Sequence, residues 1–267
     1  MTNQDNEEML TGGNVSNVYR SGGTVRRELK PDSYRIHKLL KHLENKGFSY
    51  APKFIGIDEK GREILSYIEG EAGNYPLKKY MWSDDCLIEI AKMLRFYHDS
   101  VQDFSFDESW ELLDLTPQPV EVLCHNDFAM YNIIFNHERP IGIIDFDHAA
   151  PGPRLYDIAY TLYTCVPLSR LHLSESGEVI HYNSFEHANR IKQRVALFFE
   201  SYGKEVEEYL EMVLLRLEGL CKTMVRKSSE GDLAFQKMIE EGHLEHYQSD
   251  IKFIREHGKE WICSANA

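Results

Sequence analysis

The feature that most constrains the fold is a polar segment, residues 125–132, that lies between two short apolar runs. The runs span 120–124 and 133–135, and their β-branched and large apolar residues are typical of short strands. The polar segment, called the polar loop below, places the carboxylate of Asp127 five residues before the amide of Asn132. A loop held between two strands therefore brings an acid and an amide into one small region.

A third strand-like run, 141–144, ends directly before Asp145, thirteen residues after Asn132. Phosphoryl transfer requires such a set, because one carboxylate orients the acceptor hydroxyl while an amide oxygen and another carboxylate hold Mg²⁺ against the nucleotide phosphates. Asp127, Asn132 and Asp145 are residues of these types. Each of these residues is also typical of a hydrogen-bonded turn. A metal-dependent hydrolase or glycosyltransferase that uses Asp145 and Asp147 is a further alternative, but it leaves Asp127 and Asn132 without a role.

The rest of the chain predicts an α+β protein with two lobes. Residues 1–69 predict a small N-terminal lobe: a hairpin over residues 9–30, a helix from Asp32 to Lys46, and two strand-like runs at 52–58 and 62–68. Residues 70–267 predict a larger lobe that is mostly helical, with its lobe boundary near residue 69. Apolar residues at helical spacing predict a first helix over 83–101. From Leu155 onward the pattern predicts helices only, over 154–166, 183–202, 206–227 and 231–256.

The order of these motifs resembles one known family. The pattern His125-x-Asp127 with Asn132, then Ile144-Asp145-Phe146-Asp147, then Tyr156-Asp157-Ile158-Ala159, resembles the aminoglycoside phosphotransferase and choline kinase family. This resemblance is sharp over about residues 121–160. It implies a protein-kinase-like fold, with the N-terminal lobe binding ATP or GTP and the C-terminal lobe carrying the catalytic and acceptor-binding residues.

The resemblance also implies roles for individual residues. Asp127 would be the catalytic base, Asn132 and Asp145 the Mg²⁺ ligands, and Asp147 a contributor to a second metal. Asp157 would anchor the loop, and His125 would brace it without transferring protons.

The nucleotide site matches the family less closely. Residues 12–16, Gly-Gly-Asn-Val-Ser, are expected to form the loop over the phosphates. No lysine stands on the second strand of the hairpin, so Arg26 is the predicted phosphate-binding residue, with an exposed edge-strand arginine as the alternative. The family's helix glutamate is also missing from the first helix. Ser66 and Ile68 are expected to meet the adenine edge through main-chain atoms.

The overall charge limits the partners. A formal net charge of −13 disfavours nucleic acid and anionic membrane surfaces, and no basic run opposes this average. The five cysteines are widely spaced without a CxxC pair, which predicts reduced thiols and neither a disulfide framework nor a zinc site. A polar N-terminus and the lack of a long apolar run predict a cytoplasmic protein.

Two functions follow as hypotheses. The first is a phosphotransferase that moves the γ-phosphate of ATP or GTP to a hydroxyl of a small molecule, such as an aminoglycoside or amino alcohol, with Mg²⁺. The second is a nucleotide-binding pseudokinase that acts as a regulatory or toxin-immunity protein. The second is suggested by the departures at Arg26 and the missing helix glutamate, and by the run from Gly61 to Gly70, which resembles relatives of the immunity type. The presence of Asp127, Asn132 and Asp145 favours the first.

Overall fold

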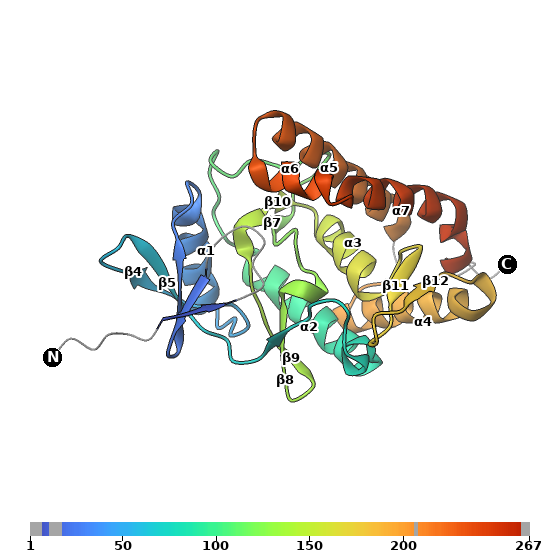
Figure 1. Cartoon of the computed structure of the whole chain (residues 1–267), viewed down its shortest axis with the longest axis horizontal. Coiled ribbons are helices and arrows are strands. Elements are labelled where there is room, and N and C mark those ends of the chain that lie inside the picture. Colours follow the sequence, from blue (N-terminus) through green and yellow to red (C-terminus); the bar gives the residue numbers. More distant parts are fainter. Residues whose placement is uncertain (1–6, 11–17, 206–207, 263–267) are drawn as a thin grey trace.

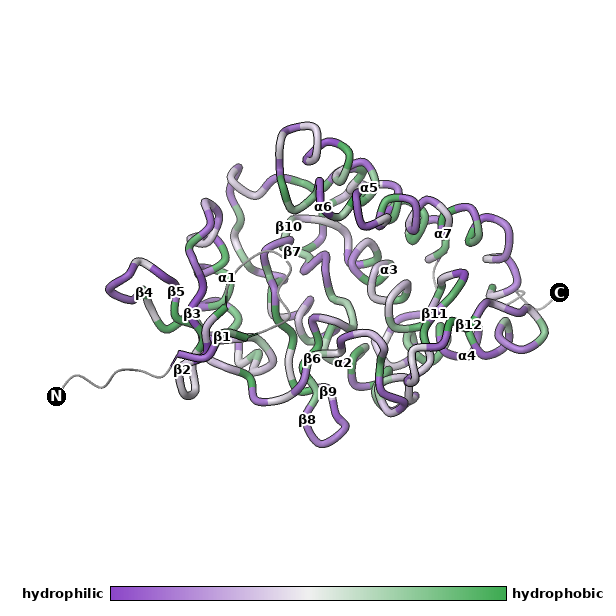
Figure 2. Tube along the Cα trace, viewed as in Figure 1, coloured by the Kyte–Doolittle hydropathy of each residue, from purple (hydrophilic) through white to green (hydrophobic). Residues whose placement is uncertain are grey.

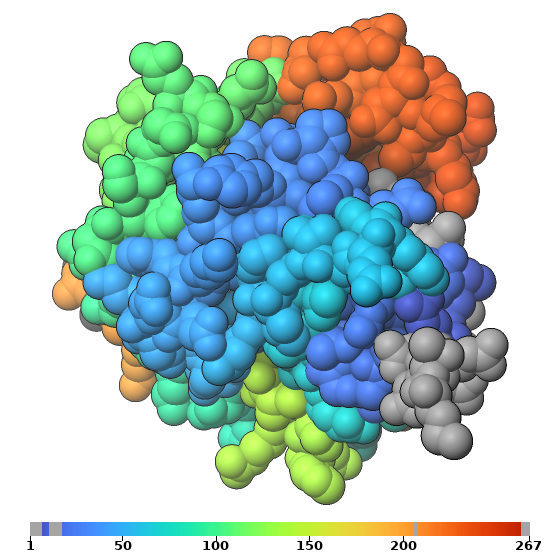
Figure 3. Space-filling model, turned by 90° about the vertical axis from the view of Figure 1, so that its left-hand side faces the viewer, coloured from blue at the N-terminus to red at the C-terminus, as the bar shows by residue number. Residues whose placement is uncertain are grey.

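A computed structural model describes residues 7–10, 18–205 and 208–262. Its N-terminal part is an antiparallel sheet with the strand order β1-β2-β3-β5-β4, accompanied by one helix, at the left of Figure 1. Turned to face the viewer, these N-terminal segments occupy the centre of the molecule (Figure 3). The elements are β1 (Glu8–Leu10), β2 (Val18–Ser21), β3 (Thr24–Glu28), α1 (Ser33–Asn45), β4 (Phe54–Ile57) and β5 (Arg62–Ser66).

Helix α1 forms because its apolar residues recur at helical spacing. Ile36, Leu39, Leu40 and Leu43 share one face, and all four are buried. The helix ends before Gly47, whose positive φ reverses the chain at little steric cost. The predicted phosphate loop, residues 12–16, lies outside the described residues.

The C-terminal part consists mainly of helices that surround a few short strands. Its first half contains β6 (Glu71–Ala72), η1 (Lys79–Trp82), α2 (Asp84–Ser100), β7 (Val122–Cys124), η2 (Met130–Asn132), β8 (Ile133–Asn136), β9 (Arg139–Ile143), η3 (Phe146–His148) and β10 (Ala150–Gly152). Its second half contains α3 (Arg154–Cys165), β11 (Leu171–Leu173), β12 (Val179–His181), α4 (Ser184–Tyr202), α5 (Tyr209–Ser229), α6 (Leu233–Glu240), α7 (His243–His257) and η4 (Gly258–Trp261). Helices α5, α6 and α7 lie along one side of α3, and α4 lies on the other (Figure 1).

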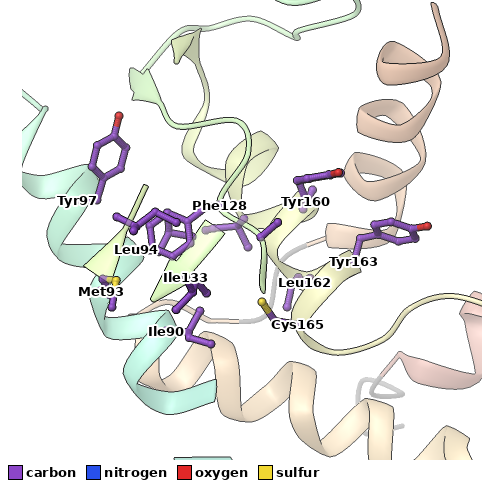
Figure 4. Packing of buried hydrophobic residues seen from close by; sticks show 14 of the residues in the cluster. Ile90, Met93, Leu94, Tyr97, Phe128, Ile133, Tyr160, Leu162, Tyr163 and Cys165 are labelled. Atoms are coloured by element: carbon purple, nitrogen blue, oxygen red, sulfur yellow. The ribbon is translucent and has the colours of Figure 1, made fainter. Parts of the chain in front are cut away.

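The core of this part lies beneath the polar loop. In Figure 4, Ile90 and Leu94 of α2 lie next to Phe128 and Ile133, and all four side chains are almost fully buried. Apolar segments of the trace are concentrated toward the interior, whereas the β4–β5 turn is hydrophilic (Figure 2). The polar loop therefore rests on a packed base, which limits how far its functional side chains can move.

The predicted fold class is confirmed: a small sheet with one helix precedes a larger helical part. The chain leaves the N-terminal sheet between β5 and β6, and a lobe boundary near residue 69 remains a prediction. None of the helices in the described ranges is both long and apolar enough to cross a membrane.

Two details of the predicted C-terminal helices are wrong. The helix expected over 231–256 is two helices, because Gly242 adopts φ +83° and starts α7 in a new direction. The region after α3 is not purely helical either, since β11 and β12 form an antiparallel hairpin between α3 and α4. These strands are only three residues long, which is too short to leave a clear periodic pattern.

Candidate active site

The polar loop is fastened to α3 by a buried carboxylate. Asp157 accepts hydrogen bonds from the main-chain N–H groups of His125 and Asn126, both at 2.8 Å. It also lies 3.0 Å from Nε2 of His98 on α2. Burial acts to raise the pKa of Asp157, but the hydrogen bonds from His98 and from the main chain of His125 outweigh it and leave that pKa lowered. This anchor agrees with the role that the resemblance implied for Asp157.

His125 supports the loop from inside. It is fully buried, its Nδ1 accepts a hydrogen bond from the main-chain N–H of Asp127 at 3.2 Å, and its ring lies 4.6 Å from that of Phe146. Burial lowers the pKa of His125, which favours the neutral ring that this hydrogen bond requires. The geometry is that of a brace.

Asp127 has both carboxylate oxygens engaged by its own loop. Oδ1 accepts a hydrogen bond from the Tyr131 hydroxyl at 2.5 Å, and Oδ2 accepts one from Nδ2 of Asn132 at 2.7 Å. Tyr131 in turn lies 3.0 Å from the hydroxyl of Tyr160 on α3. Asp127 is only partly buried. Because each carboxylate oxygen has two lone pairs, Oδ1 still offers an acceptor position to an incoming hydroxyl.

One of the predicted metal ligands, Asn132, contacts the other oxygen of Asp127. Asn132 uses its amide nitrogen to hold Asp127, so its amide oxygen remains available as a ligand. Asp145 follows β9 in a left-handed conformation, φ +62°, and its side chain is 45% exposed. Desolvation of the carboxylate by surrounding protein atoms, together with the negative charges of Asp147 and Asp127, raises the pKa of Asp145.

The donors of Asn132 and Asp145 fit Mg²⁺ by their type, because an amide oxygen and a carboxylate are the hard oxygen ligands that this ion prefers. Among the described residues, the cluster whose side chains lie close enough together to offer three ligands is His98, Cys124 and Asp157. Its histidine nitrogens are already engaged by Tyr202 and Asp157, at 2.7 and 3.0 Å, so it is a structural cluster.

An arginine of β3 reaches this acidic group, and it is Arg27. Its guanidinium makes two hydrogen bonds to Asp147, at 3.0 and 2.9 Å, and lies 3.9 Å from Asp145. Arg26 points to the other face of the strand, where it donates to Oγ1 of Thr24. Arg27 thus lies beside Asp145, one of the predicted metal ligands, and Arg26 does not; phosphate binding by Arg26 stays a prediction. Alternation along the strand separates the two arginines, but the sequence does not say which face meets the polar loop.

Arg27 is held by a glutamate from a neighbouring strand. Glu63 of β5 stands directly opposite Arg27, 2.6 Å from its Nε, and is fully buried. The second oxygen of Glu63 lies 2.6 Å from Nε2 of His37 on α1. Burial acts to lower the pKa of Arg27, but Asp147 and Glu63 outweigh it and raise that pKa. A strand glutamate, itself contacted by a histidine of α1, therefore holds Arg27.

The two residues predicted to contact adenine, Ser66 and Ile68, differ in whether their main-chain groups already form hydrogen bonds. The amide of Ser66 already donates to the carbonyl of Lys53 at 2.9 Å, and its hydroxyl accepts from the Lys53 amide at 2.8 Å. Ile68 lies just beyond β5, and in the described part of the chain its main-chain groups take part in no turn or loop hydrogen bond. Ile68 is therefore better placed than Ser66 to pair with an adenine edge, and both remain predictions.

Two further residues near Asp127 were not identified from the sequence. Tyr131 lies inside the polar loop, where its position directly before Asn132 could have drawn attention to it. Arg216 of α5 donates to the main-chain oxygen of Asn126 at 2.7 Å, across ninety residues of sequence. No local pattern marks Arg216, because only the packing of α5 on α3 brings it to the loop.

A separate cavity of about 410 Å³ lies under the β11–β12 hairpin. Trp82, His172, Tyr182 and Arg190 are among its lining residues, and none of the predicted site residues lines it. The acidic group around Asp127 is therefore a different site.

Comparison with known proteins agrees with this geometry. Residues 85–175, which include the polar loop and Asp145, match the model of the phosphotransferase enzyme family, APH. The chain is 37% identical over 153 residues to the trifolitoxin immunity protein of Rhizobium leguminosarum bv. trifolii, a match that spans 55% of this chain and 57% of that relative.

Solved structures share the fold at low sequence identity. Amicoumacin kinase hAmiN, solved with AMP-PNP, Ca²⁺ and Ami, superposes with a TM-score of 0.62 at 13% identity, covering 90% of this chain and 89% of that one. Choline kinase from Cryptosporidium parvum gives 0.61 at 11%, covering 97% and 92%. Aminoglycoside 2′-phosphotransferase-IIIa, solved with GDP, gives 0.57 at 16%, covering 92% of each chain. This chain thus has the fold of these kinases and phosphotransferases, and its residues 85–175 match the phosphotransferase enzyme family.

Proposed function

We propose that this protein transfers the γ-phosphate of ATP or GTP to a hydroxyl group of a small molecule. The observation that carries the proposal is the convergence of Asp127, Asn132 and Asp145. Asn132 holds one oxygen of Asp127, and Asp145 is close enough to Asp127 for its pKa to be raised by that charge. Such an arrangement serves phosphoryl transfer, in which the protein mainly positions the reactants and neutralises charge.

Each residue has a distinct part in this proposal. Asp127 accepts the proton of the acceptor hydroxyl at Oδ1, beside Tyr131, while Asn132 fixes the orientation of the carboxylate. Asn132 and Asp145 would hold Mg²⁺, which neutralises charge on the phosphates when it is bound. Arg27, held by Glu63 and Asp147, is the cation best placed to meet a phosphate oxygen.

A second candidate function is supported by the similarity to an immunity protein. In that case the chain would bind nucleotide and act through a partner without turnover. The engagement of Arg27 by two carboxylates favours this candidate, because a phosphate has to compete with Asp147 for the guanidinium.

The experiment that separates the two is an ADP- or GDP-release assay with Mg²⁺ and a panel of hydroxylated acceptors: kanamycin, choline, ethanolamine, glycerol, D-glycerate and D-gluconate. We expect turnover with one class of acceptor, reduced by about 10²- to 10⁴-fold in Asp127→Asn, since this is the usual contribution of a general base. Asp85→Asn is the matched control, because Asp85 is an exposed aspartate of α2 with the same charge change. Equal silence of wild type and Asp127→Asn, with nucleotide and Mg²⁺ still bound, would leave only the second candidate.

A further inference from the structure

A buried arginine beside the polar loop has no acidic partner in the part of the chain that the structure describes. Arg216 is only 5% exposed, its guanidinium donates to the Asn126 carbonyl, and its Nε is buried without a hydrogen-bond acceptor. Among the described residues, no carboxylate forms an ion pair with it. Leaving a buried cation unpaired costs several kcal/mol, so a retained one calls for a reason.

The other buried arginines show how unusual this is. Arg194 of α4 is also 5% exposed, and it pairs with Asp84 at 2.9 Å. Arg27 pairs with both Glu63 and Asp147. Arg216 instead lies over the rings of Tyr160 and Tyr156, with its guanidinium carbon 4.7 and 5.4 Å from their centres. Ring stacking compensates part of the cost of burying the charge but supplies no counter-charge.

Arg216 lies on one side of Asp127. The two oxygens of Asp127 contact different groups: Oδ2 contacts Asn132, one of the predicted metal ligands, and Oδ1 contacts Tyr131 and, through it, Tyr160. Arg216 stacks on Tyr160, so it belongs to the Oδ1 side, where a hydroxyl acceptor has to approach. In Figure 4, Tyr160 and Tyr163 point away from α2, toward the helices that follow in the chain.

Tyrosines, not free acids, form this side of the site. Tyr131, Tyr160, Tyr163 and Tyr247 lie together, and the carboxylates that act on them are Asp127 and Asp250. Asp250 is fully buried and already accepts from the Tyr163 hydroxyl at 2.6 Å. Tyr131 and Tyr247 are partly exposed, so the tyrosine group opens to the surface. A polycation would find no unpaired carboxylate among these groups except Asp127 itself.

From this arrangement we propose that Arg216 binds an anionic group of the acceptor, so that the acceptor is a small hydroxylated anion, such as a hydroxy acid or sugar acid, and not a polycationic aminoglycoside. The inference rests on the proposed phosphotransferase function, because it concerns the acceptor of the same site. A carboxylate or phosphate would supply the missing counter-charge and accept hydrogen bonds from the guanidinium. The tyrosine hydroxyls would meet the remaining oxygen atoms of such a molecule.

Binding to the full chain, measured by calorimetry without nucleotide, tests the inference. Each probe is compared with its uncharged counterpart: D-gluconate with sorbitol, and D-glycerate with glycerol. Kanamycin and choline represent cationic acceptors. We expect the anion of at least one pair to bind ten-fold or more tightly than its neutral counterpart and than either cation. Arg216→Gln should abolish this preference, and Arg216→Lys should retain part of it.

Lys222→Gln is the matched control, because Lys222 is an exposed cation on the same helix and the substitution changes the charge equally. The variant should keep the anion preference of wild type. Folding of each variant is checked by circular dichroism, and if Arg216→Gln does not fold, the matched pairs on wild type and Arg216→Lys still decide. Equal binding of anionic and neutral probes by wild type, or an unchanged preference in folded Arg216→Gln, overturns the inference.

The binding experiment on Arg216 and the turnover assay for the proposed function can fail independently of each other. If the anions bind through Arg216 but none of them releases ADP or GDP, the subsite stands and the phosphotransferase function fails. If nucleotide is turned over only with cationic or neutral acceptors, the function stands and the Arg216 inference fails.

Discussion

A single arginine joins three parts of the chain at the candidate active site. Arg27 of β3 links Glu63 of β5 to Asp147, which follows β9 and also contacts Lys30 at 2.6 Å. Arg27 and Glu63 are 13% and 0% exposed, so this cluster is screened from water. Removing one member of such a cluster destabilises the protein, because it leaves an uncompensated charge in the interior.

We therefore expect Arg27→Met to lower the free energy of unfolding by about 3 kcal/mol, and to weaken nucleotide binding. Arg26→Met on the opposite face of β3 is the control and should change stability by less than about 1 kcal/mol, since among the described residues Arg26 forms no ion pair and its side chain donates a hydrogen bond to a threonine hydroxyl. Urea-induced unfolding followed by circular dichroism measures both. Equal losses in the two variants would contradict the assignment of Arg27 to the buried cluster.

At the scale of elements, the segment after the N-terminal sheet lies directly against the polar loop. β6 pairs with β8, and the next residue, Gly73, donates its main-chain N–H to the Ile133 carbonyl at 3.1 Å. A β-carbon on Gly73 would collide with the main-chain oxygen of Met130 in η2. Close backbone contact at this point thus fixes η2, which leads into Asn132.

Gly73→Ala should consequently destabilise the protein by about 1–3 kcal/mol and reduce the affinity for Mg²⁺–nucleotide, because η2 must shift to admit the methyl group. Gly56→Ala in β4 is the control, since a methyl group at that position would have no neighbouring atom within 4 Å. The stability of this control should stay within about 1 kcal/mol of wild type. Thermal unfolding and nucleotide titration measure the two effects. A tolerated Gly73→Ala would mean that the segment is not in contact with η2 in solution.

At the scale of the whole molecule, buried histidines join α2 to the polar loop. His98 and His125 are fully buried, and burial lowers the pKa of each. Unfolding restores the ordinary histidine pKa of about 6.5, so the unfolded chain binds more protons than the folded one as the pH falls through this value. Both groups therefore stabilise the fold at neutral pH, and that contribution is lost under mild acid.

The free energy of unfolding should fall between pH 7.5 and pH 5.5, with each of these histidines contributing up to about 1.4 kcal/mol per pH unit. His98→Gln should lower the overall stability, yet make its dependence on pH shallower. His181→Gln, which replaces an exposed histidine of β12, should leave the slope as in wild type. Chemical unfolding at a series of pH values provides the measurement, and an unchanged slope in His98→Gln would refute this account.

The predictions from sequence were most accurate where the pattern is local. Asp127 and Asn132 lie five residues apart between two short strands, so the chain between them has few conformations that keep both strands buried. Helices such as α1 and α3 were placed within one or two residues, because their apolar periodicity is strong. The break at Gly242 was missed because the charged residues around it continue a helical pattern on both sides.

By itself, the sequence determined the fold class, the family resemblance and the spacing of Asp127, Asn132 and Asp145, since these depend on periodicity and on neighbours along the chain. Only the tertiary structure showed that Arg27, and not Arg26, contacts Asp147, because this depends on which face of β3 meets the rest of the protein. Only the structure brought Arg216 to Asn126, because that contact joins residues ninety positions apart through the packing of α5 on α3. Long-range packing, and not local pattern, thus selects the charges that lie near the polar loop.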